Sequence, residues 1–309
     1  MIRVENLTKY YGKRLVVDNI SFQVKEGEIV GFLGPNAAGK TTTMRMLTGF
    51  LGPTQGNAWI GGYDVMNNSL EARKHIGYLP EAVSLYADMT VRSFLEFSAR
   101  LRGLDKNRMK RRTDDVVCMC HLEQYRDVLI GKLSKGFRQR VGIAQAILHE
   151  PEVLILDEPT IGIDPIQMAM TRELIVELGK KHTVLLSTHT LPEISVICER
   201  VIILHEGKIV AEDRIENLSS MIGGAKRIRL KVDGPTEKVT ERLHQIEGIR
   251  RVYLQGLHHV IECSEARDSR PNIMEAIVQK GWTLLSMESL EMDLEDIFLK
   301  LIAEVEEKK

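Results

Sequence analysis

The hydrophobic and polar residues of this chain follow two periods, one typical of strands and one typical of amphipathic helices. Residues 3–7, 15–17 and 20–24 have strand composition and are separated by turns, which predicts an antiparallel start to the fold. From residue 90 to residue 120 the apolar positions return every three or four residues, so a helical segment is expected there. The opening third therefore combines a small antiparallel sheet with helices.

Three short apolar runs predict strands that are buried on both faces, unlike the strands at the start of the chain. Residues 29–33, 153–156 and 183–187 offer apolar side chains to both faces, which is typical of central parallel strands covered by helices. Helices are expected at residues 137–149 and 171–179. This succession of strands and helices predicts an α/β fold with a largely parallel main sheet.

The first of these runs leads into a phosphate-binding loop. Gly34-x-x-x-x-Gly39-Lys40-Thr41 stands between the expected strand and a helix expected at residues 41–47. The glycines let successive backbone N–H groups point inward, and the start of the helix attracts anions. Lys40 suits the outer phosphates and the Thr41 hydroxyl suits Mg²⁺. For this stretch alone, a glycine turn with a chance lysine is the alternative interpretation.

Paired acids follow the second apolar run. Asp157 and Glu158 lie where a buried strand ends, and two carboxylates there are costly unless a cation faces them. In open α/β sheets, ligands bind outside the carboxyl ends of the strands. Asp157 and Lys40 are therefore expected to converge on one crevice.

The pattern changes again near residue 218, where a second, smaller domain is expected. Its elements follow the order strand, helix, strand, strand, helix, strand, which is the ferredoxin-like plan. The strands are expected at residues 227–232, 251–255, 259–263 and 282–287, and the helices at 237–246 and 271–279, with a final amphipathic helix at 294–305.

Composition, charge and cysteine spacing exclude several classes of protein. The chain has 309 residues and a net charge of -1, so its charge balance does not favour nucleic acid as a partner. No apolar run approaches the ~18 residues needed to cross a bilayer, and no charged-then-apolar leader opens the chain. A soluble, cytoplasmic protein is therefore expected. Disulfide and zinc spacings are absent among the cysteines, so reduced thiols are expected at Cys118, Cys120, Cys198 and Cys263.

Three features leave alternatives open. Tyr11, near the first turn, is either a packing residue or a platform for a base. The basic stretch from Arg100 to Arg112 is either a solvated helix face or a surface for a partner or lipid. The second domain shares its plan with RNA-recognition modules, but those need two or three aromatics on adjacent strands and only Tyr253 stands there. A dimer-contact or regulatory role is expected for it instead.

Five stretches of the first domain, taken together, resemble the nucleotide-binding subunit of an ABC transporter. Their order and spacing agree with that family, and other phosphate-loop proteins lack its signature motif. The stretches are a Walker A loop at residues 34–42, the signature motif at 133–137, a Walker B strand at 153–158, the loop that follows it at 161–164, and the switch histidine, His189.

The resemblance covers residues 1 to about 217 and implies a phosphate-loop NTPase fold of the ABC cassette type. Such a cassette has a mixed, mainly parallel core sheet, an antiparallel β subdomain and a helical subdomain, here at about residues 86–150. Residues 218–309 are left as a C-terminal α+β accessory domain of the ferredoxin-like plan.

The resemblance also implies roles for single residues. Glu158 would be the general base that orients the attacking water, and His189 would contact the γ-phosphate, so that Lys40, Glu158 and His189 form the catalytic set. Mg²⁺ would be held by Thr41, Glu81 and Asp157. The nucleotide itself would be bound by Tyr11, Gly34, Pro35, Asn36, Ala37, Ala38, Gly39, Lys40, Thr41 and Thr42.

In this family each site is completed by a second subunit. The signature residues would therefore reach ATP bound to the opposite copy, beside Asp164 of the loop after Walker B. The signature residues are Leu133, Ser134, Lys135, Gly136 and Phe137.

Three departures from the family pattern are present. Ala37 replaces a glycine in the middle of Walker A, which is tolerable if its φ is negative. Glu81 stands where a glutamine is usual; a carboxylate can still ligate Mg²⁺, but it adds a charge and loses a donor. Lys135 and Phe137 replace a glycine and a glutamine of the signature, and Lys135 either adds charge near the phosphate or points to solvent, which is favoured.

The expected function is an ATPase subunit that powers a separate membrane permease through ATP-driven closure of a dimer. The motifs resemble the exporter branch found in drug-resistance, polysaccharide-export and gliding-motility systems, so export is expected. A permease and a second ATPase subunit, a homodimer by preference, are the expected partners, with ATP and Mg²⁺ as cofactors and no nucleic acid. The protein would lie at the inner face of the membrane. The alternatives are a soluble ABC-type ATPase acting on ribosomes or DNA, and a kinase or GTPase, which would leave the signature motif unexplained.

Overall fold

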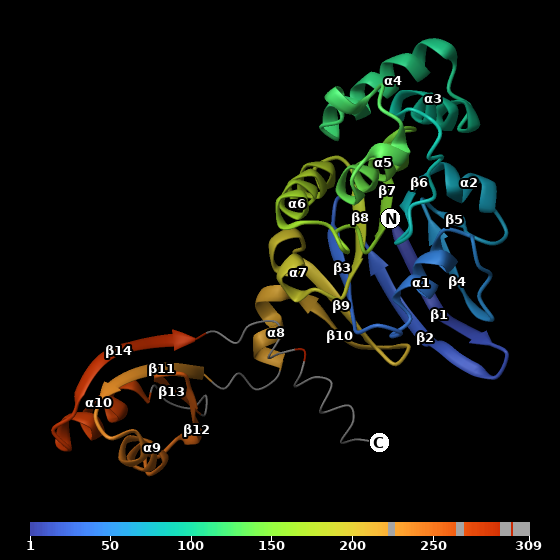
Figure 1. Ribbon diagram of the computed structural model, residues 1–309. Coiled ribbons are helices and arrows are strands. Elements are labelled where there is room, and N and C mark those ends of the chain that lie inside the picture. Colours follow the sequence, from blue (N-terminus) through green and yellow to red (C-terminus); the bar gives the residue numbers. More distant parts are fainter. Residues whose placement is uncertain (222–225, 264–268, 291–297, 299–309) are drawn as a thin grey trace. The chain divides into compact units, whose positions relative to one another are not determined.

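The computed structural model of the protein describes residues 1–221, 226–263, 269–290 and 298. The chain divides into two compact units, Met1–Arg214 and Ile215–Lys309. The division falls three residues before the boundary expected from the sequence. Figure 1 shows the order of the elements along both units.

A six-stranded sheet forms the centre of the first unit, with the strand order β10-β9-β3-β8-β7-β6. All neighbouring pairs are parallel except β10 with β9. The strands are β3 (Ile29–Leu33), β6 (Ile76–Leu79), β7 (Val153–Asp157), β8 (Thr183–Thr188), β9 (Arg200–His205) and β10 (Lys208–Arg214). Every residue of β7 and β8 is buried, as their apolar runs predict for strands that are covered on both faces. The largely parallel sheet is confirmed.

A second, antiparallel sheet has the order β2-β1-β4-β5. It is built from β1 (Ile2–Tyr11), β2 (Arg14–Val24), β4 (Gln55–Ile60) and β5 (Tyr63–Asp64). The two strands expected at residues 15–17 and 20–24 are one strand, so that expectation was wrong. The pairing of β1 with β2 shifts register between Leu7 and Lys9, and Asn19 has a φ of 49°, so a bulge absorbs the polar residues that suggested a break.

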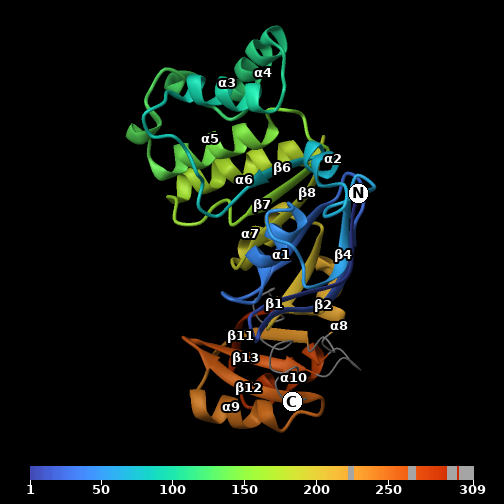
Figure 2. The ribbon, with the colours of Figure 1, turned by 90° about the vertical axis from the view of Figure 1, so that its right-hand side faces the viewer.

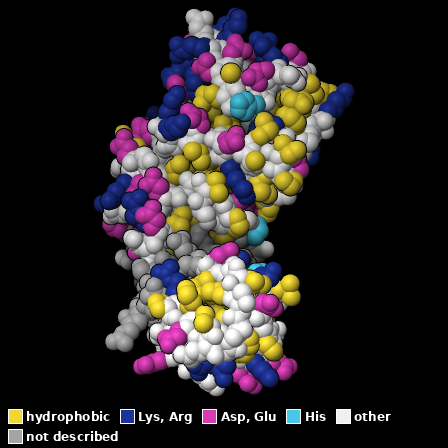
Figure 3. Space-filling model, turned by 90° about the vertical axis from the view of Figure 1, so that its left-hand side faces the viewer, with side chains coloured by type: hydrophobic (Ala, Val, Ile, Leu, Met, Phe, Trp, Pro, Cys, Tyr) yellow, Lys and Arg dark blue, Asp and Glu magenta, His cyan; other side chains and the backbone are white. Residues whose placement is uncertain are grey.

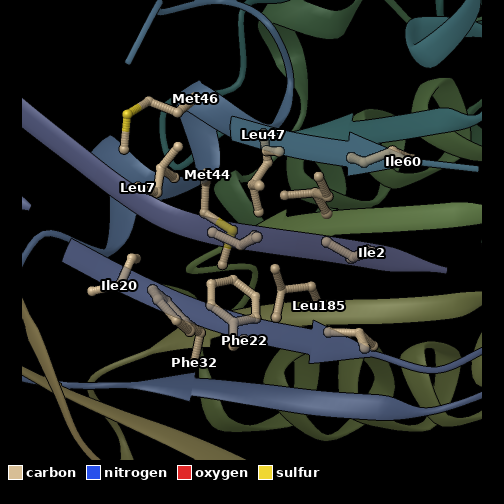
Figure 4. Packing of buried hydrophobic residues seen from close by; sticks show 14 of the residues in the cluster. Ile2, Leu7, Ile20, Phe22, Phe32, Met44, Met46, Leu47, Ile60 and Leu185 are labelled. Atoms are coloured by element: carbon tan, nitrogen blue, oxygen red, sulfur yellow. The ribbon is translucent and has the colours of Figure 1, made fainter. Parts of the chain in front are cut away.

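The hydrophobic core of the first unit lies between the two sheets and the helix α1 (Lys40–Leu47). Figure 4 shows Met44 and Leu47 of α1 packed towards Phe22 of the antiparallel sheet and Phe32 of the parallel one. The two phenylalanine rings are 5.5 Å apart. Because its buried face fills this core, α1 holds the loop before it in a fixed position.

The helical segment expected at residues 90–120 consists of two helices, α3 (Val91–Leu101) and α4 (Lys106–Met119). Gly103 turns the chain with a φ of 78°, and Asp105 caps α4 by accepting from the N–H groups of Asn107 and Arg108. The turn lies inside the periodic region, so apolar spacing alone did not reveal it. A short helix, α2 (Ser69–Lys74), precedes β6.

Three more helices surround the parallel sheet. They are α5 (Lys135–Ile147), α6 (Pro165–Gly179) and α7 (Leu191–Ile197). Helix α6 begins six residues earlier than expected because Asp164 caps it and Pro165 occupies its first turn. The sequence analysis did not find α7, whose seven residues are too few to show a period.

The second unit has the element order that the ferredoxin-like plan requires. After α8 (Ile215–Met221) come β11 (Lys226–Asp233), α9 (Thr236–His244), β12 (Ile249–Gln255), β13 (His258–Cys263), α10 (Arg270–Gln279) and β14 (Thr283–Leu290). The strands form an antiparallel sheet in the order β12-β13-β11-β14. Both helices pack on one face of this sheet through a core that includes Leu230, Leu243 and Ile277 (Figure 2). The final helix expected at residues 294–305 lies outside the described residues, apart from residue 298.

No helix in the described part of the chain combines the length and the apolar character that a bilayer crossing needs. None of the four cysteines, all within the described residues, forms a disulfide: Cys118 is exposed, whereas Cys120, Cys198 and Cys263 are buried.

Arg112 differs from the rest of the basic stretch, for which a solvated helix face and a partner or lipid surface were the alternatives. Most basic side chains of α4 are exposed, and Figure 3 shows Lys and Arg gathered over this helix at the top of the view. Arg112 instead is buried and donates to the backbone carbonyls of Ile147 and Leu148, at the end of α5. It therefore satisfies acceptors that a helix C-terminus leaves free, and joins α4 to α5.

We expect Arg112→Ala to lower the free energy of unfolding by about 2–3 kcal/mol, because buried carbonyl oxygens lose a charged donor. Urea denaturation followed by circular dichroism measures the change. Arg111→Ala, on the exposed side of the same helix, is the control and should change stability by less than about 0.5 kcal/mol. Equal losses in the two variants would contradict the role given to Arg112.

Candidate functional site

The phosphate loop joins β3 to α1 and depends on two glycines. A Cβ atom at Gly34 would lie 2.3 Å from the backbone oxygen of Leu204. Gly39 has a φ of 105°, and its Cβ would meet the backbone oxygen of Val16. Neither position can accept another residue without movement of neighbouring backbone. The loop is thus held closely between β2 and the end of β9.

Lys40 is the first residue of α1 and its side chain is only 6% exposed. Its ammonium donates to the carbonyl oxygens of Gly34 (2.7 Å) and Pro35 (3.2 Å) and lies 3.4 Å from Glu158 Oε1. The charge is therefore balanced by a carboxylate as well as by the loop it belongs to. Lys40 therefore meets the second acid at the end of β7, Glu158, whereas Asp157, the acid expected to converge with it, contacts the neighbouring Thr41.

Asp157 ends β7 directly opposite Thr41. The Thr41 hydroxyl donates to Asp157 Oδ1 at 3.2 Å, and the Ser187 hydroxyl donates to the same oxygen at 2.5 Å. The second carboxylate oxygen, Oδ2, is buried and has no hydrogen-bond partner among the described residues. Burial raises the pKa of Asp157, the hydrogen bonds from Ser187 and Thr41 lower it, and the negative charges of Glu81 and Glu158 raise it.

Glu158 is held in a left-handed backbone conformation, with a φ of 50°. Its N–H donates to the backbone oxygen and the hydroxyl of Ser187, both at 3.1 Å. The carboxylate is nearly buried, and its Oε2 lies 2.9 Å from Nδ1 of His189. Glu158 therefore lies between Lys40 on one side and His189 on the other.

Lys40, Thr41 and Glu158 open onto a cavity of about 520 Å³, which neither Asp157 nor His189 lines. The described residues that line it are Tyr11, Arg14, Val16, Asn36, Ala37, Gly39, Lys40, Thr41, Thr42, Glu81, Glu158 and Ile161. Seven of the predicted nucleotide-binding residues are in this group, as are Glu81 and Glu158. Gly34 and Ala38 are buried behind the loop surface, and Pro35 lines an adjoining cavity of about 380 Å³.

The signature residues lie elsewhere in the protomer. Ser134 caps α5 by accepting from the N–H of Phe137, and the Phe137 ring contacts that of Tyr125. Lys135 is exposed and its ammonium lies against Gly162. Of the described residues 133–137, none lines the cavity around Lys40. Within one protomer, the signature residues and the residues of the phosphate loop therefore do not share a cavity.

Two comparisons decide the family. The family model described as ABC transporter matches residues 17–161. The bacitracin transport ATP-binding protein BcrA of Bacillus licheniformis is 37% identical over 98% of this chain and 97% of its own length. The chain belongs to the ABC transporter family.

Other members of the family match this chain, one over nearly its whole length in sequence and others in the fold of about 70% of it. The linearmycin resistance ATP-binding protein LnrL of Bacillus subtilis is 33% identical over 97% of this chain and 98% of its own. Among solved structures, an ATP binding subunit of an ABC transporter matches 72% of this chain and 93% of its own, with a TM-score of 0.66 and 31% identity. The dimeric cassette MJ0796 matches 70% of this chain and 99% of its own, with a TM-score of 0.63 and 26% identity.

These matches confirm the ABC cassette fold of the first unit. They also give the function at the level of the family: the chain is an ATP-binding subunit of an ABC transporter, and its enzymatic activity is ATP hydrolysis. Subunits of this family work with membrane permeases and form dimers.

The sequence analysis missed several residues of the cassette site. Arg14, Val16 and Ile161 line the cavity, and Ser187 hydrogen-bonds to both acids at the end of β7. Arg14 follows Tyr11 by three residues in the same hairpin, which was an available signal. The position of Ser187 could not be read from the sequence, because it depends on β7 and β8 being neighbours in register.

Ala37 does not meet the condition set for it, because its φ is 65° rather than negative. Its side chain is exposed at the cavity, so no packing compensates the unfavourable conformation. An L-residue other than glycine, asparagine or aspartate rarely adopts this conformation, and the cost is about 1 kcal/mol. The cassette therefore carries backbone strain where the family usually has a glycine.

We expect Ala37→Gly to raise the free energy of unfolding by about 0.5–1 kcal/mol, since the strain that it relieves exceeds the extra chain entropy of glycine. Urea denaturation tests this. Ala38→Gly is the matched control: Ala38 is buried and does not have a positive φ, so the same substitution should destabilise the protein. A loss of stability in both variants would show that Ala37 is not strained.

Proposed function

We propose that this chain drives export through a separate membrane permease, with two copies of the chain closing on two ATP molecules. The observation that carries the proposal is Glu158, which lines the cavity beside Lys40 and is held between Lys40 and His189, with the signature residues outside the cavity. The similarity to proteins named for bacitracin transport and linearmycin resistance supports export, since it spans nearly the whole chain.

Glu158 is the proposed general base. Its carboxylate is nearly buried and fixed between Lys40 and His189, so it can accept a proton from a water that attacks the γ-phosphate. Lys40 balances the charge of the outer phosphates, and His189, which is exposed and lies 2.9 Å from Glu158, contacts the γ-phosphate. Phosphoryl transfer requires mainly positioning and charge neutralisation, which these side chains supply.

The same site fits Mg²⁺. Asp157 Oδ2 is buried without a partner among the described residues; burial raises the pKa of Asp157, and the charges of Glu81 and Glu158 raise it further, so a cation here would stabilise the carboxylate. Thr41 offers a hydroxyl oxygen, and Glu81 lines the cavity beside it. Mg²⁺ held by these side chains would neutralise charge on the phosphates. In the described residues, no three His, Cys, Asp or Glu side chains are grouped so as to hold a metal ion by themselves.

Tyr11 and the signature residues complete the nucleotide site. Tyr11 is exposed at one end of the cavity, where its ring is a platform for adenine. Ser134 and Gly136 stand at the start of α5, and a helix N-terminus attracts phosphate. Because the five signature residues lie away from the cavity of their own protomer, we assign them to ATP held by the partner copy. Asp164, which caps α6, lies in the loop that adjoins the partner.

The permease is proposed to contact the cassette near Glu81 and residues 85–105. This stretch leads from the cavity into α3 and exposes two large apolar side chains, Tyr86 and Leu101. A membrane location then follows from the permease. The alternative, an ABC-type ATPase that acts on ribosomes or DNA, has no comparable support from the two curated relatives described above.

We expect Glu158→Gln to lower the turnover of ATP at least about 100-fold, because an amide cannot accept the proton of the attacking water. Affinity for ATP should stay within a few-fold of the parent, since the phosphate loop is unchanged. Phosphate release measures turnover, and fluorescence of a labelled ATP analogue measures binding. With ATP and Mg²⁺, the variant should elute as a stable dimer in size-exclusion chromatography.

Lys40→Ala is the contrasting variant, because it should lose nucleotide binding itself rather than the chemical step. Hydrolysis by Glu158→Gln at a rate close to that of the parent would remove Glu158 as the base. Undiminished ATP binding by Lys40→Ala would mean that the loop does not hold the phosphates.

Purification from mild detergent extracts separates transport from the alternative. We expect the tagged chain to bring down an integral membrane protein with several apolar spans, each about 20 residues long. Co-sedimentation with ribosomes, together with absence from the membrane fraction, would contradict the transport proposal and favour the alternative.

A further inference from the structure

A buried carboxylate outside the catalytic set joins the segments that carry Glu158 and His189. Glu193 lies on α7 and its side chain is 2% exposed. It accepts hydrogen bonds from the hydroxyls of Thr160 and Thr188, the second at 2.8 Å, and Arg172 lies 3.7 Å away. Burying a carboxylate is costly unless such partners are present, so this position is a specific arrangement and not ordinary packing.

One of these hydrogen bonds fixes the backbone around His189. The Thr188 hydroxyl donates to Glu193 and also accepts from the N–H of Thr190 at 3.0 Å, so that it bridges His189. The N–H of Glu193 in turn donates to the backbone oxygen of Thr190 at 3.2 Å. Glu193 therefore closes a ring of hydrogen bonds around the two peptide units on either side of His189.

The other hydrogen bond fixes the chain that follows Glu158. Thr160 lies two residues after Glu158, and the N–H of Ile161 donates back to the Glu158 carbonyl at 3.2 Å. Glu158 itself has a positive φ, a conformation that persists only when the surroundings hold it. By holding Thr160 from the opposite side, Glu193 helps to maintain that conformation.

We propose that Glu193 is a positioning residue that holds the Glu158 and His189 segments in register. Its hydrogen bonds and ion pair in the described residues are with Thr160, Thr188 and Arg172, and it acts through the two threonines to maintain the 2.9 Å contact between Glu158 Oε2 and His189 Nδ1. Arg172, on α6, compensates its charge and extends the link to the helix that Asp164 caps. The inference rests on the proposed function, since it presumes that Glu158 and His189 act on ATP.

The first test is Glu193→Gln, which keeps the shape of the side chain but removes its charge and one acceptor. We expect kcat for ATP hydrolysis to fall about 10- to 100-fold, because displacement of reacting groups by about 1 Å has effects of that size. The Kd for ATP should change less than about threefold, since Glu193 does not line the cavity. Glu199→Gln, an exposed glutamate six residues later, is the control and should retain the activity of the parent.

The second test asks whether Glu193 acts through Thr188. Thr188→Val removes the bridging hydroxyl and should lower kcat by a similar factor, whereas Thr188→Ser keeps the hydroxyl and should restore it. In the double variant Glu193→Gln, Thr188→Val, the fall in kcat should equal that of the worse single variant, because both changes break the same hydrogen bond. Two independent structural defects would instead multiply their losses.

Each outcome decides a separate question. Near-normal kcat in Glu193→Gln, or multiplied losses in the double variant, would overturn the role of Glu193 even if Glu158→Gln is inactive. Near-normal turnover in Glu158→Gln would instead overturn the proposed function. If Glu193→Gln does not fold, Thr188→Val and Thr188→Ser carry the test, and equal activity in those two variants would overturn the inference.

Discussion

The rest of the structure depends on the balance of buried charge at the carboxyl ends of the parallel strands. Lys40, Asp157 and Glu158 are each at most 6% exposed, and isolated ions at that depth would be unstable. They persist because Lys40 faces Glu158 and two carbonyl oxygens, while hydroxyls donate to Asp157. The strand order β3-β8-β7 places these groups on one edge. The glycines of the phosphate loop are required because the backbone must pass close to β2 and β9 to reach that edge.

Backbone strain accompanies this balance on both sides of the cavity. Ala37 in the phosphate loop and Glu158 after β7 both have positive φ values, each at a cost of order 1 kcal/mol or more. For Ala37 the surroundings supply no compensating packing, whereas Glu158 is held by Ser187 and by the segment that Thr160 anchors. Strain that hydrogen bonds hold in place keeps a reacting group in one orientation. Ala37 is exposed and no hydrogen bond of its side chain holds it, so its strain does not orient a reacting group. The strain at Glu158 contributes to the site, whereas the strain at Ala37 only lowers stability.

The sequence predicted what depends on local pattern and missed what depends on packing between distant segments. The phosphate loop, the paired acids and the six-element plan of the second unit follow from motifs and periods, and the structure has them. Arg112 looked like one of several surface cations, because its partners are carbonyls at the end of a helix some 35 residues away. Helix α7 was too short to show a period, so Glu193 could not be placed near the acids. Ala37 was judged from its residue type alone, and its φ depends on how the loop is held.

The contacts of the signature turn bear on how one protomer can change shape. Gly136 packs so closely against Gln167 that a Cβ atom there would overlap its side chain, and Arg140 donates to Gln167 at 2.6 Å. Arg140 is itself buried, whereas Gln167 is half-buried. Helix α5 and the start of α6 are thereby in direct contact. If α5 and its signature residues move and the loop around Asp164 does not, the buried guanidinium of Arg140 loses its acceptor on Gln167. If the loop moves with α5, this hydrogen bond is kept. Because the loss of this hydrogen bond is costly, the signature residues and the loop around Asp164 are expected to move together.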